Sequence, residues 1–421
     1  MAKVPCMYAM MLDDATSNYQ YIHRLYYVPE TGKWTPSEVW YSARVQFANN
    51  WGFGSVSVRT PSQNLFLLAY PRTDDNGLTV DVTTAYPWVT FFAYKTALSD
   101  LWTIDLNYAS QNPGSYGPPY PYNNTGSGRQ YYLMGLKYGP TGPPYDFYLA
   151  AYGSADLQTW VNLDTSAEKH FVYPFTDGQA SWTQSNFDNK MFVAYQSGGL
   201  VRLIWFDCAT ETWNSDTATF PAPASTVGHV GAPLKRPDGS MVFFHTDLIS
   251  GNSAVVLRVL DILGGTWGSQ VQVSTYPFSA RDITFGDAIM DDSGNLHLTY
   301  SYTDNTFAQR IAYRRYSSSN VLSTEIIFDS VGDRPSNILI YDNQAWICFD
   351  LSNFSGEPAW GLSYMKSSNL TPNATTDWTS HRVEQPNQAY PYEAYLLSTI
   401  LSEPPCSCPP VTPAAKYGII V

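Results

Sequence analysis

The stretch Gly286–Tyr316 begins with Asp287-Ala-Ile-Met-Asp291, turns at Asp292-Ser-Gly-Asn295 and continues as Leu296-His-Leu-Thr-Tyr-Ser-Tyr302. After a polar link it ends in Arg310-Ile-Ala-Tyr-Arg-Arg-Tyr316. Alternation of apolar and polar residues with a period of two is typical of half-buried strands, and Asp, Asn and Gly favour tight turns. The stretch therefore predicts three antiparallel strands, which form most of one blade of a β-propeller.

A tryptophan that follows a turn rich in Ser, Thr and Asp recurs along the chain of 421 residues. The intervals between copies are similar, except that the last is about twice as long as the others. A degenerate unit at Tyr316-Ser-Ser-Ser-Asn320 fills this gap, so seven units fit the sequence. We expect the repeat tryptophans to be structural and buried between or beneath the sheets; they are Trp34, Trp102, Trp160, Trp213, Trp267 and Trp378.

A repeat of this length that contains only strands and turns predicts small sheets arranged radially. An isolated four-stranded sheet exposes two edges and two apolar faces, whereas several sheets closed into a ring bury the faces and leave only short edges. The predicted fold is therefore all-β, with residues 1–421 in a single β-propeller of seven blades. A propeller of six blades and a pair of β-sandwich domains are the alternatives.

The two ends of the chain are expected to close the ring. The first unit, near Trp34, lacks an inner strand, while Tyr392–Ser398 has the pattern of a first strand. Lys416–Val421 is predicted to be the last strand and to complete the first sheet, and the Pro-rich residues 402–415 form the linker to it. Residues 109–128, rich in Pro, Gly and Tyr, predict a long loop, which is either a solvated connector or a binding loop.

The composition is that of a turn-rich all-β protein. Aromatic residues make up 15% of the chain and charged residues only 14%, with a formal net charge of −13. Nucleic acid and anionic membranes are not expected as partners, because binding to them needs a basic patch. No apolar run is long enough to span a membrane, and the apolar run at the N-terminus is too short and too broken for us to expect a signal peptide there. We expect an extracellular or virion protein, which reaches its location after processing or by release in a virus particle.

The sequence predicts neither a metal site nor a cofactor. Cys208 and Cys348 lie in strand-like runs, where a small buried thiol is the ordinary interpretation. Cys6, Cys406 and Cys408 lie near the termini, and their spacing does not fit a zinc knuckle. A disulfide from Cys6 and free thiols are both consistent with this spacing. Gly-x-Ser-x-Gly, phosphate-binding loops and dinucleotide fingerprints are absent.

The turn Ser154-Ala-Asp-Leu-Gln-Thr-Trp160 resembles the Asp-box of sialidase-type propellers, in which a Ser-x-Asp turn leads into a Trp. A longer copy, from Ser368 to Trp378, has Asn in place of Asp. The resemblance implies a propeller whose peripheral turns are stabilised by these motifs. If the chain were an active sialidase, the resemblance would also imply an Arg triad that binds a carboxylate, a nucleophilic Tyr paired with a Glu, and an Asp that acts as the acid. The arginines near strand ends are Arg59, Arg129, Arg236, Arg281 and Arg334, and only Arg334-Pro335 is similar to the family's Arg-Ile-Pro signature.

A small ligand is expected in the funnel at one end of the ring axis, where the inner strands converge. The candidate ligand-binding residues at the starts of these strands are His229, Asp282, Asp287, Asp333 and Arg334. A glycoside hydrolase needs two carboxylates at one bond, and Glu393 is a further candidate for such a pair. A structural interpretation stands beside each, because acidic residues are common in turns and an Arg neutralises neighbouring carboxylates.

The positive chemical signal is the number of Trp and Tyr side chains outside the repeat positions. Such rings stack on sugar faces, but they also fill protein interfaces and the seams between blades, which we favour for strand-embedded residues such as Trp346. We predict a non-catalytic binding or structural propeller on an extracellular or phage virion surface, with a glycan or a protein as partner, or a component of an oligomeric assembly. An exo-acting glycoside hydrolase of sialidase-like fold is the alternative.

Overall fold

The computed structural model shows a chain built almost entirely of β-strands. The residues that the structure describes are 3–12, 20–35, 38–42, 55–57, 66–72, 89–95, 103–105, 120–138, 146–155, 160–163, 169–172, 182–197, 200–214, 218–221, 233–249, 252–261, 266–268, 270–277, 284–304, 306, 308–328, 334–351, 361–382 and 390–400. Over these residues the one helix is a single 3-10 turn, η1 (Thr375–Asp377), and none is long enough to cross a membrane. The predicted all-β class is confirmed for this part of the chain.

The described strands pair antiparallel into seven sheets, called sheets 1 to 7 in chain order. Sheet 1 contains β1 (Lys3–Leu12), β2 (Gln20–Val28), β3 (Lys33–Trp34), β4 (Glu38–Ser42) and β32 (Tyr390–Ile400). Sheet 2 contains β5 (Ser55–Ser57), β6 (Phe66–Arg72), β7 (Val89–Lys95) and β8 (Thr103–Asp105). Sheet 3 contains β9 (Tyr120–Asn124), β10 (Arg129–Tyr138), β11 (Asp146–Ser154), β12 (Trp160–Asn162) and β13 (Lys169–Val172). Sheet 4 contains β14 (Trp182–Phe187), β15 (Lys190–Ser197), β16 (Leu200–Asp207), β17 (Thr212–Trp213) and β18 (Ala218–Pro221).

Each of the remaining three sheets is made from one contiguous segment of the chain. Sheet 5 contains β19 (Leu234–Lys235), β20 (Met241–Ile249), β21 (Asn252–Asp261), β22 (Thr266–Trp267) and β23 (Val271–Pro277). Sheet 6 contains β24 (Thr284–Met290), β25 (Leu296–Thr303), β26 (Gln309–Tyr316) and β27 (Ile326–Phe328). Sheet 7 contains β28 (Arg334–Tyr341), β29 (Gln344–Leu351), β30 (Gly361–Ser367) and β31 (Trp378–Arg382).

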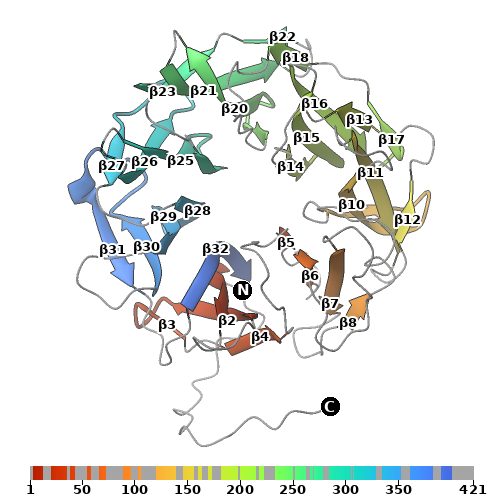
Figure 1. Ribbon diagram of the computed structural model, residues 1–421, viewed down its shortest axis with the longest axis horizontal. Helices are drawn as coiled ribbons and strands as arrows, with labels where there is room; N and C mark the ends of the chain where they lie inside the picture. Colours follow the sequence, from red (N-terminus) through yellow and green to blue (C-terminus); the bar gives the residue numbers. More distant parts are fainter. Residues whose placement is uncertain are drawn as a thin grey trace, which may run out of the picture.

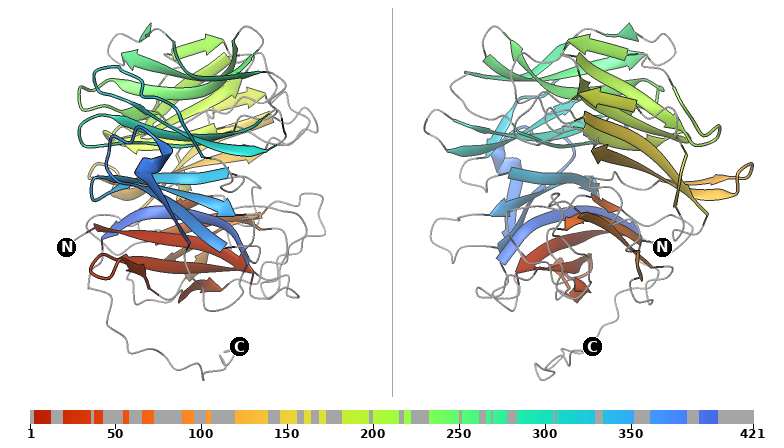
Figure 2. Two further views of the ribbon diagram at one scale, coloured as in Figure 1. Left: turned by 90° about the vertical axis from the view of Figure 1, so that its left-hand side faces the viewer. Right: turned by 45° about the vertical axis from the view of Figure 1, so that its right-hand side comes forward.

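The sheets lie around a common centre (Figure 1), with β5, β14, β28 and β32 nearest to it. Figure 2 shows them from the side, stacked face against face. Strands β24 and β28, and strands β28 and β32, contact each other across the boundaries between their sheets. The inner strands of sheets 6, 7 and 1 therefore contact one another across the boundaries between these sheets.

The stretch that defines the repeat forms most of sheet 6, as predicted. Asp291 donates its backbone N–H to the carbonyl of Asn295 at 2.8 Å, which closes the turn between β24 and β25. Gly294 in this turn has a φ of +76°, a conformation that glycine adopts at no steric cost. The prediction of a half-buried strand is wrong for β25, because all of its residues are buried. Apolar residues of sheet 5 cover one face of β25, and β28 of sheet 7 also contacts β25.

The described repeat tryptophans occupy one position in the fold. Counted outward from the central strand of each sheet, each lies on the short strand that follows the third strand and pairs with that third strand. The register pairs are Tyr27 with Trp34, Ser154 with Trp160, Phe206 with Trp213, Leu260 with Trp267 and Ser367 with Trp378. In sheet 6 the corresponding bridge joins Tyr316 to Leu322, so the degenerate unit keeps the position with a different apolar residue. Trp160 and Trp378 are buried, and Trp34 and Trp213 are partly buried. Trp102 lies outside the described residues.

The two ends of the described chain meet in sheet 1. Both edges of β1 are paired, one with β2 and the other with β32, so that Lys3 lies opposite Ile400 and Leu12 opposite Tyr390 (Figure 1). The position predicted for Lys416–Val421 beside β1 is thus taken by β32, whose 11 residues match the 10 residues of β1. Residues 402–421 lie outside the described residues.

Part of the predicted loop at residues 109–128 is a β-hairpin. Tyr120–Asn124 forms β9, and the following turn leads directly into β10. The Asn124 side chain stabilises this turn, because its Oδ1 accepts the backbone N–H of Gly126 at 2.9 Å and of Ser127 at 3.2 Å. Residues 109–119 are not among those described.

Buried aromatic side chains fill the seams between neighbouring sheets. Between sheets 7 and 1, Trp346 is 1% exposed and stacks on Tyr364 with their ring centroids 5.1 Å apart. The ring of Tyr27 meets Trp346 at 5.0 Å in an edge-on geometry. Each such aromatic pair contributes about 0.5–1.5 kcal/mol beyond the burial of area. Trp346 therefore packs in a seam, as favoured from the sequence, and Cys208 and Cys348 are buried free thiols, as expected.

Candidate functional site

A β-bulge lies near the start of the inner strand in three neighbouring sheets. These strands are β24, β28 and β32, of which β28 contacts both of the others. Each strand shifts its register against the second strand of its sheet, which leaves one unpaired residue: Gly286, Ser336 and Tyr392, respectively. Bulges bend a strand and re-aim its side chains, and they are over-represented next to functional sites.

The residues that follow the three bulges are Asp287, Asn337 and Glu393. They occupy equivalent register positions on adjacent inner strands. Carboxylates accept hydrogen bonds, and an amide both donates and accepts them. The three strands therefore bring hydrogen-bonding residues to one level near the centre, which we call the bulge site.

Asp287 connects sheet 6 to sheet 7 through its side chain. Its Oδ1 accepts the backbone N–H of Ala288 at 2.8 Å, and its Oδ2 accepts the backbone N–H of Ile338 at 3.2 Å. Ile338 lies on β28, one residue after Asn337. The carboxylate thus satisfies a backbone donor that the ladder of β28 leaves unpaired next to its bulge.

The environment of Asp287 disfavours its charged form. Protein atoms surround the carboxyl densely although the residue keeps some exposed surface, and this desolvation raises its pKa to about 6. The hydrogen bonds from Ile338 and Ala288 act in the opposite direction but do not outweigh it. Asp287 therefore changes its charge near neutral pH, as ligand-binding and acid–base groups often do.

The other predicted site residues are placed less completely. His229, Asp282 and Asp333 lie outside the described residues. Arg334 is the first residue of β28, three positions before Asn337, and its register partner is Asp350 on β29. The role of Arg334 therefore stays a prediction.

Arg59 and Arg281, two of the arginines named for the triad that the sialidase resemblance implies, lie outside the described residues. Arg129 forms an ion pair of 2.7 Å with Glu211, between sheets 3 and 4. Arg236 is 4% exposed and donates to Asn320 Oδ1 at 2.9 Å, between sheets 5 and 6. Arg334 starts β28 of sheet 7, and the Arg triad stays a prediction.

Two tyrosines pair with glutamates, but both pairs lie in seams. Tyr132 donates its hydroxyl to Glu211 Oε1 at 2.8 Å, and burial raises its pKa to about 12. Tyr300, which is fully buried, donates to Glu325, and burial together with that carboxylate raises its pKa well above the usual value. A nucleophilic tyrosine needs the opposite shift, so neither hydroxyl is activated.

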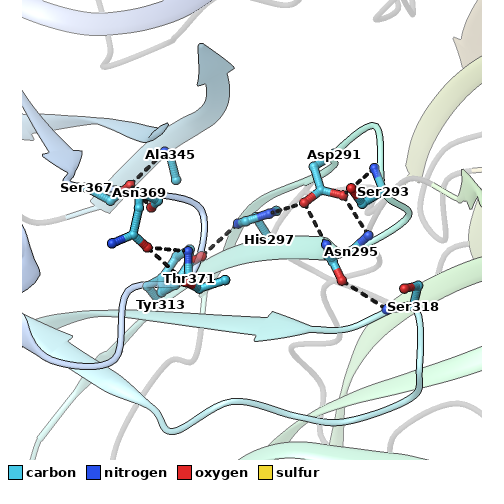
Figure 3. A network of polar contacts seen from close by, with 10 residues as sticks. All are labelled: Asp291, Ser293, Asn295, His297, Tyr313, Ser318, Ala345, Ser367, Asn369 and Thr371. Carbon is cyan, nitrogen blue, oxygen red and sulfur yellow. Dashed lines mark hydrogen bonds and ion pairs between the residues drawn. The ribbon is translucent and has the colours of Figure 1, made fainter. Parts of the chain in front are cut away.

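A buried polar chain that the sequence analysis missed runs through sheet 6 (Figure 3). His297 lies between Asp291 and Tyr313, with its Nε2 3.2 Å from Asp291 Oδ2 and its Nδ1 2.7 Å from the Tyr313 hydroxyl. Burial lowers the pKa of His297. Although burial opposes it, hydrogen bonds from Asn295 and His297 hold the pKa of Asp291 below its usual value. Asp291, His297 and Tyr313 are buried and hydrogen-bonded to one another, which is a structural arrangement. The signal in the sequence was a His inside the alternating strand, six residues after the Asp of the turn.

Over the described part of the chain, no group of three or more His, Cys, Asp or Glu side chains is placed to hold a metal ion. No protein-family model and no curated protein matches this sequence. The resemblance of Ser154–Trp160 to an Asp-box therefore stays a prediction.

Several solved structures are similar at low identity. A polysaccharide lyase described as an ulvan lyase is 13% identical, with a TM-score of 0.47 over 86% of this chain and 87% of that one. An α-L-arabinofuranosidase from Fusarium graminearum is 11% identical, with a TM-score of 0.39 over 68% and 84%. A eukaryotic initiation factor is 8% identical, with a TM-score of 0.40 over 94% and 98%. Likenesses with TM-scores under 0.5 say nothing about what this chain binds or does.

Proposed function

We propose that the chain is a single seven-bladed β-propeller that binds a carbohydrate at the bulge site without cleaving it. The observation that carries this proposal is the equivalent placement of Asp287, Asn337 and Glu393 after three adjacent bulges. The seven sheets and the pairing of β1 with β32 support the closed ring. Residues 402–415 remain the proposed linker to a last strand at Lys416–Val421.

The residue types of the bulge site fit a polyhydroxylated ligand. Sugar hydroxyls donate to carboxylates and both donate to and accept from amides. A non-catalytic role is supported by the hydrogen bonds of Asp287, since both of its oxygens already hold a backbone N–H. A second support is that neither described Tyr–Glu pair lies at the bulge site.

An exo-acting glycoside hydrolase is the second candidate. It is favoured by the raised pKa of Asp287, about 6, because a general acid must be protonated near neutral pH. Glu393, at the equivalent position on β32, supplies the second carboxylate that such an enzyme needs. For the non-catalytic glycan-binding propeller, we further propose an extracellular or virion location and a place in an oligomeric assembly.

A screen of the intact protein against an array of neutral and acidic oligosaccharides tests these functions. Binding without release of product supports the non-catalytic role, and it should weaken in Asp287→Asn and Glu393→Gln while an Asp292→Asn control, in the exposed turn after β24, binds like the wild type. Product release that both site variants abolish supports the hydrolase. Binding that neither variant alters would place the ligand elsewhere and contradict the bulge site.

A further inference from the structure

We propose that Asp287 contacts the ligand in its ionised form, so that carbohydrate binding at the bulge site is coupled to release of one proton. This inference rests on the proposed function and concerns the regulation of the same site. It assigns to Asp287 a contact with ligand hydroxyls in addition to its bond across the boundary between sheets 6 and 7.

The geometry leaves room for such contacts. An ionised carboxylate has about four acceptor positions, and Asp287 uses two of them for Ala288 and Ile338. The residue keeps some exposed surface, although its neighbours on β25 are fully buried. A ligand hydroxyl can therefore reach an acceptor that no described group occupies.

The charged and titratable groups near Asp287 come from the strands that pack against β24. β25 carries His297, which is bonded to Asp291 and Tyr313. β28 carries Arg334 and Tyr341, and Glu393 lies beyond it on β32. Over the described residues, desolvation raises the pKa of Asp287, and the backbone hydrogen bonds from Ile338 and Ala288 lower it.

A hydroxyl donor changes this balance. It stabilises the ionised carboxylate and not the protonated carboxyl, so the ligand binds the ionised form more tightly and lowers its pKa. With a pKa of about 6 in the free protein, roughly one molecule in eleven is ionised at pH 5 and ten in eleven at pH 7. The affinity is expected to rise about tenfold between these pH values.

Calorimetric titration with the strongest-binding oligosaccharide of the array tests the coupling. At pH 6 we expect release of about half a proton per ligand bound, measured from the difference between two buffers of unlike ionisation enthalpy. The dissociation constant should fall about tenfold from pH 5 to pH 7. Asp287→Asn should bind more weakly than the wild type at both pH values, by more than tenfold at pH 7, with no change of its own between them, while Asp292→Asn should behave as the wild type.

The outcomes separate this inference from the proposed function. Wild-type binding that is unchanged from pH 5 to pH 7, without proton release, overturns the coupling and leaves the binding function standing. Absence of binding to every oligosaccharide at both pH values overturns the proposed function and the coupling together. The measurements of proton release and pH dependence on the wild type decide the question even if Asp287→Asn does not fold.

Discussion

Replacing Asp287 with Asn is expected to change the sign of its effect on stability as the pH rises. Burial raises the pKa of Asp287 from 3.8 to about 6. The folded state therefore binds this proton more tightly than the unfolded state. Below about pH 3.8 the carboxyl is protonated in both states, and its burial does not lower the free energy of unfolding. The cost grows as the pH rises and is complete above about pH 6. One pKa unit corresponds to about 1.4 kcal/mol, so the full cost is about 3 kcal/mol.

The amide of Asn removes this cost but loses a hydrogen bond. It has one acceptor oxygen instead of two, so either Ala288 N–H or Ile338 N–H is left without its partner. A buried donor without a partner costs about 1–2 kcal/mol at every pH. The variant should therefore be less stable than the wild type by about 1–2 kcal/mol at pH 4 and more stable by a similar amount at pH 7.

Urea unfolding of the wild type and of Asp287→Asn at pH 4, 5, 6 and 7 measures this difference. Other titrating groups cancel, because they are present in both proteins. Asp292→Asn is the matched control, since Asp292 is exposed in the turn that follows β24. If the difference between Asp287→Asn and the wild type stays constant from pH 4 to pH 7, the carboxyl is not desolvated and the reasoning is refuted.

Three further predictions concern the seams and the ends of the chain. Trp378→Ala should lower the free energy of unfolding by about 3–5 kcal/mol, because Trp378 is 6% exposed and its ring packs on Tyr313 and Phe328 with centroid distances of 4.9 and 5.2 Å. Chemical denaturation measures this loss, with Val321→Ala at an exposed position as the neutral control. A loss under about 1 kcal/mol would contradict the packing. Asn320→Asp should stabilise the fold by about 1 kcal/mol, because it gives the buried Arg236 a carboxylate where no described one forms an ion pair with it; the gain should vanish in an Arg236→Met background, and persistence there would contradict the pairing. Deletion of residues 390–421 should lower stability by roughly 3 kcal/mol or more, because β1 loses its partner, and an unchanged melting temperature would count against this role of β32. Deletion of Lys416–Val421 alone measures whether the predicted last strand also contributes.

Local patterns were sufficient to predict the strands of sheet 6. Alternation and turn residues act over a few neighbours, so Leu296–Tyr302 could be assigned as a strand without knowledge of the fold. The described repeat tryptophans mark the same position in their sheets, and the gap at Tyr316 contains Leu322 in that position. Burial of both faces of β25 was missed because it depends on sheets that are distant in sequence.

The bulge site could be predicted only in part. Asp287 was named from its place at a strand start, but its bond to Ile338 spans 51 residues and depends on how two sheets stack. The bulges leave no pattern beyond Gly286, since Ser336 and Tyr392 are ordinary strand residues. The choice of β32 as partner of β1 was likewise beyond the sequence, because both Tyr392–Ser398 and Lys416–Val421 read as strands.

The pairing of β1 with β32 has a consequence for synthesis of the chain. Sheets 3 to 7 are made from contiguous segments and need only short-range pairing. In sheet 1, by contrast, Lys3 pairs with Ile400, so this pairing can form only after residue 400 has been synthesised. Pairing over such a separation is slow, because the entropy of closing the loop is lost before the contacts form. Until the ribosome has released the last strand, β1 presents an open edge to any other chain nearby. Nascent or truncated chains should therefore associate through their first strand.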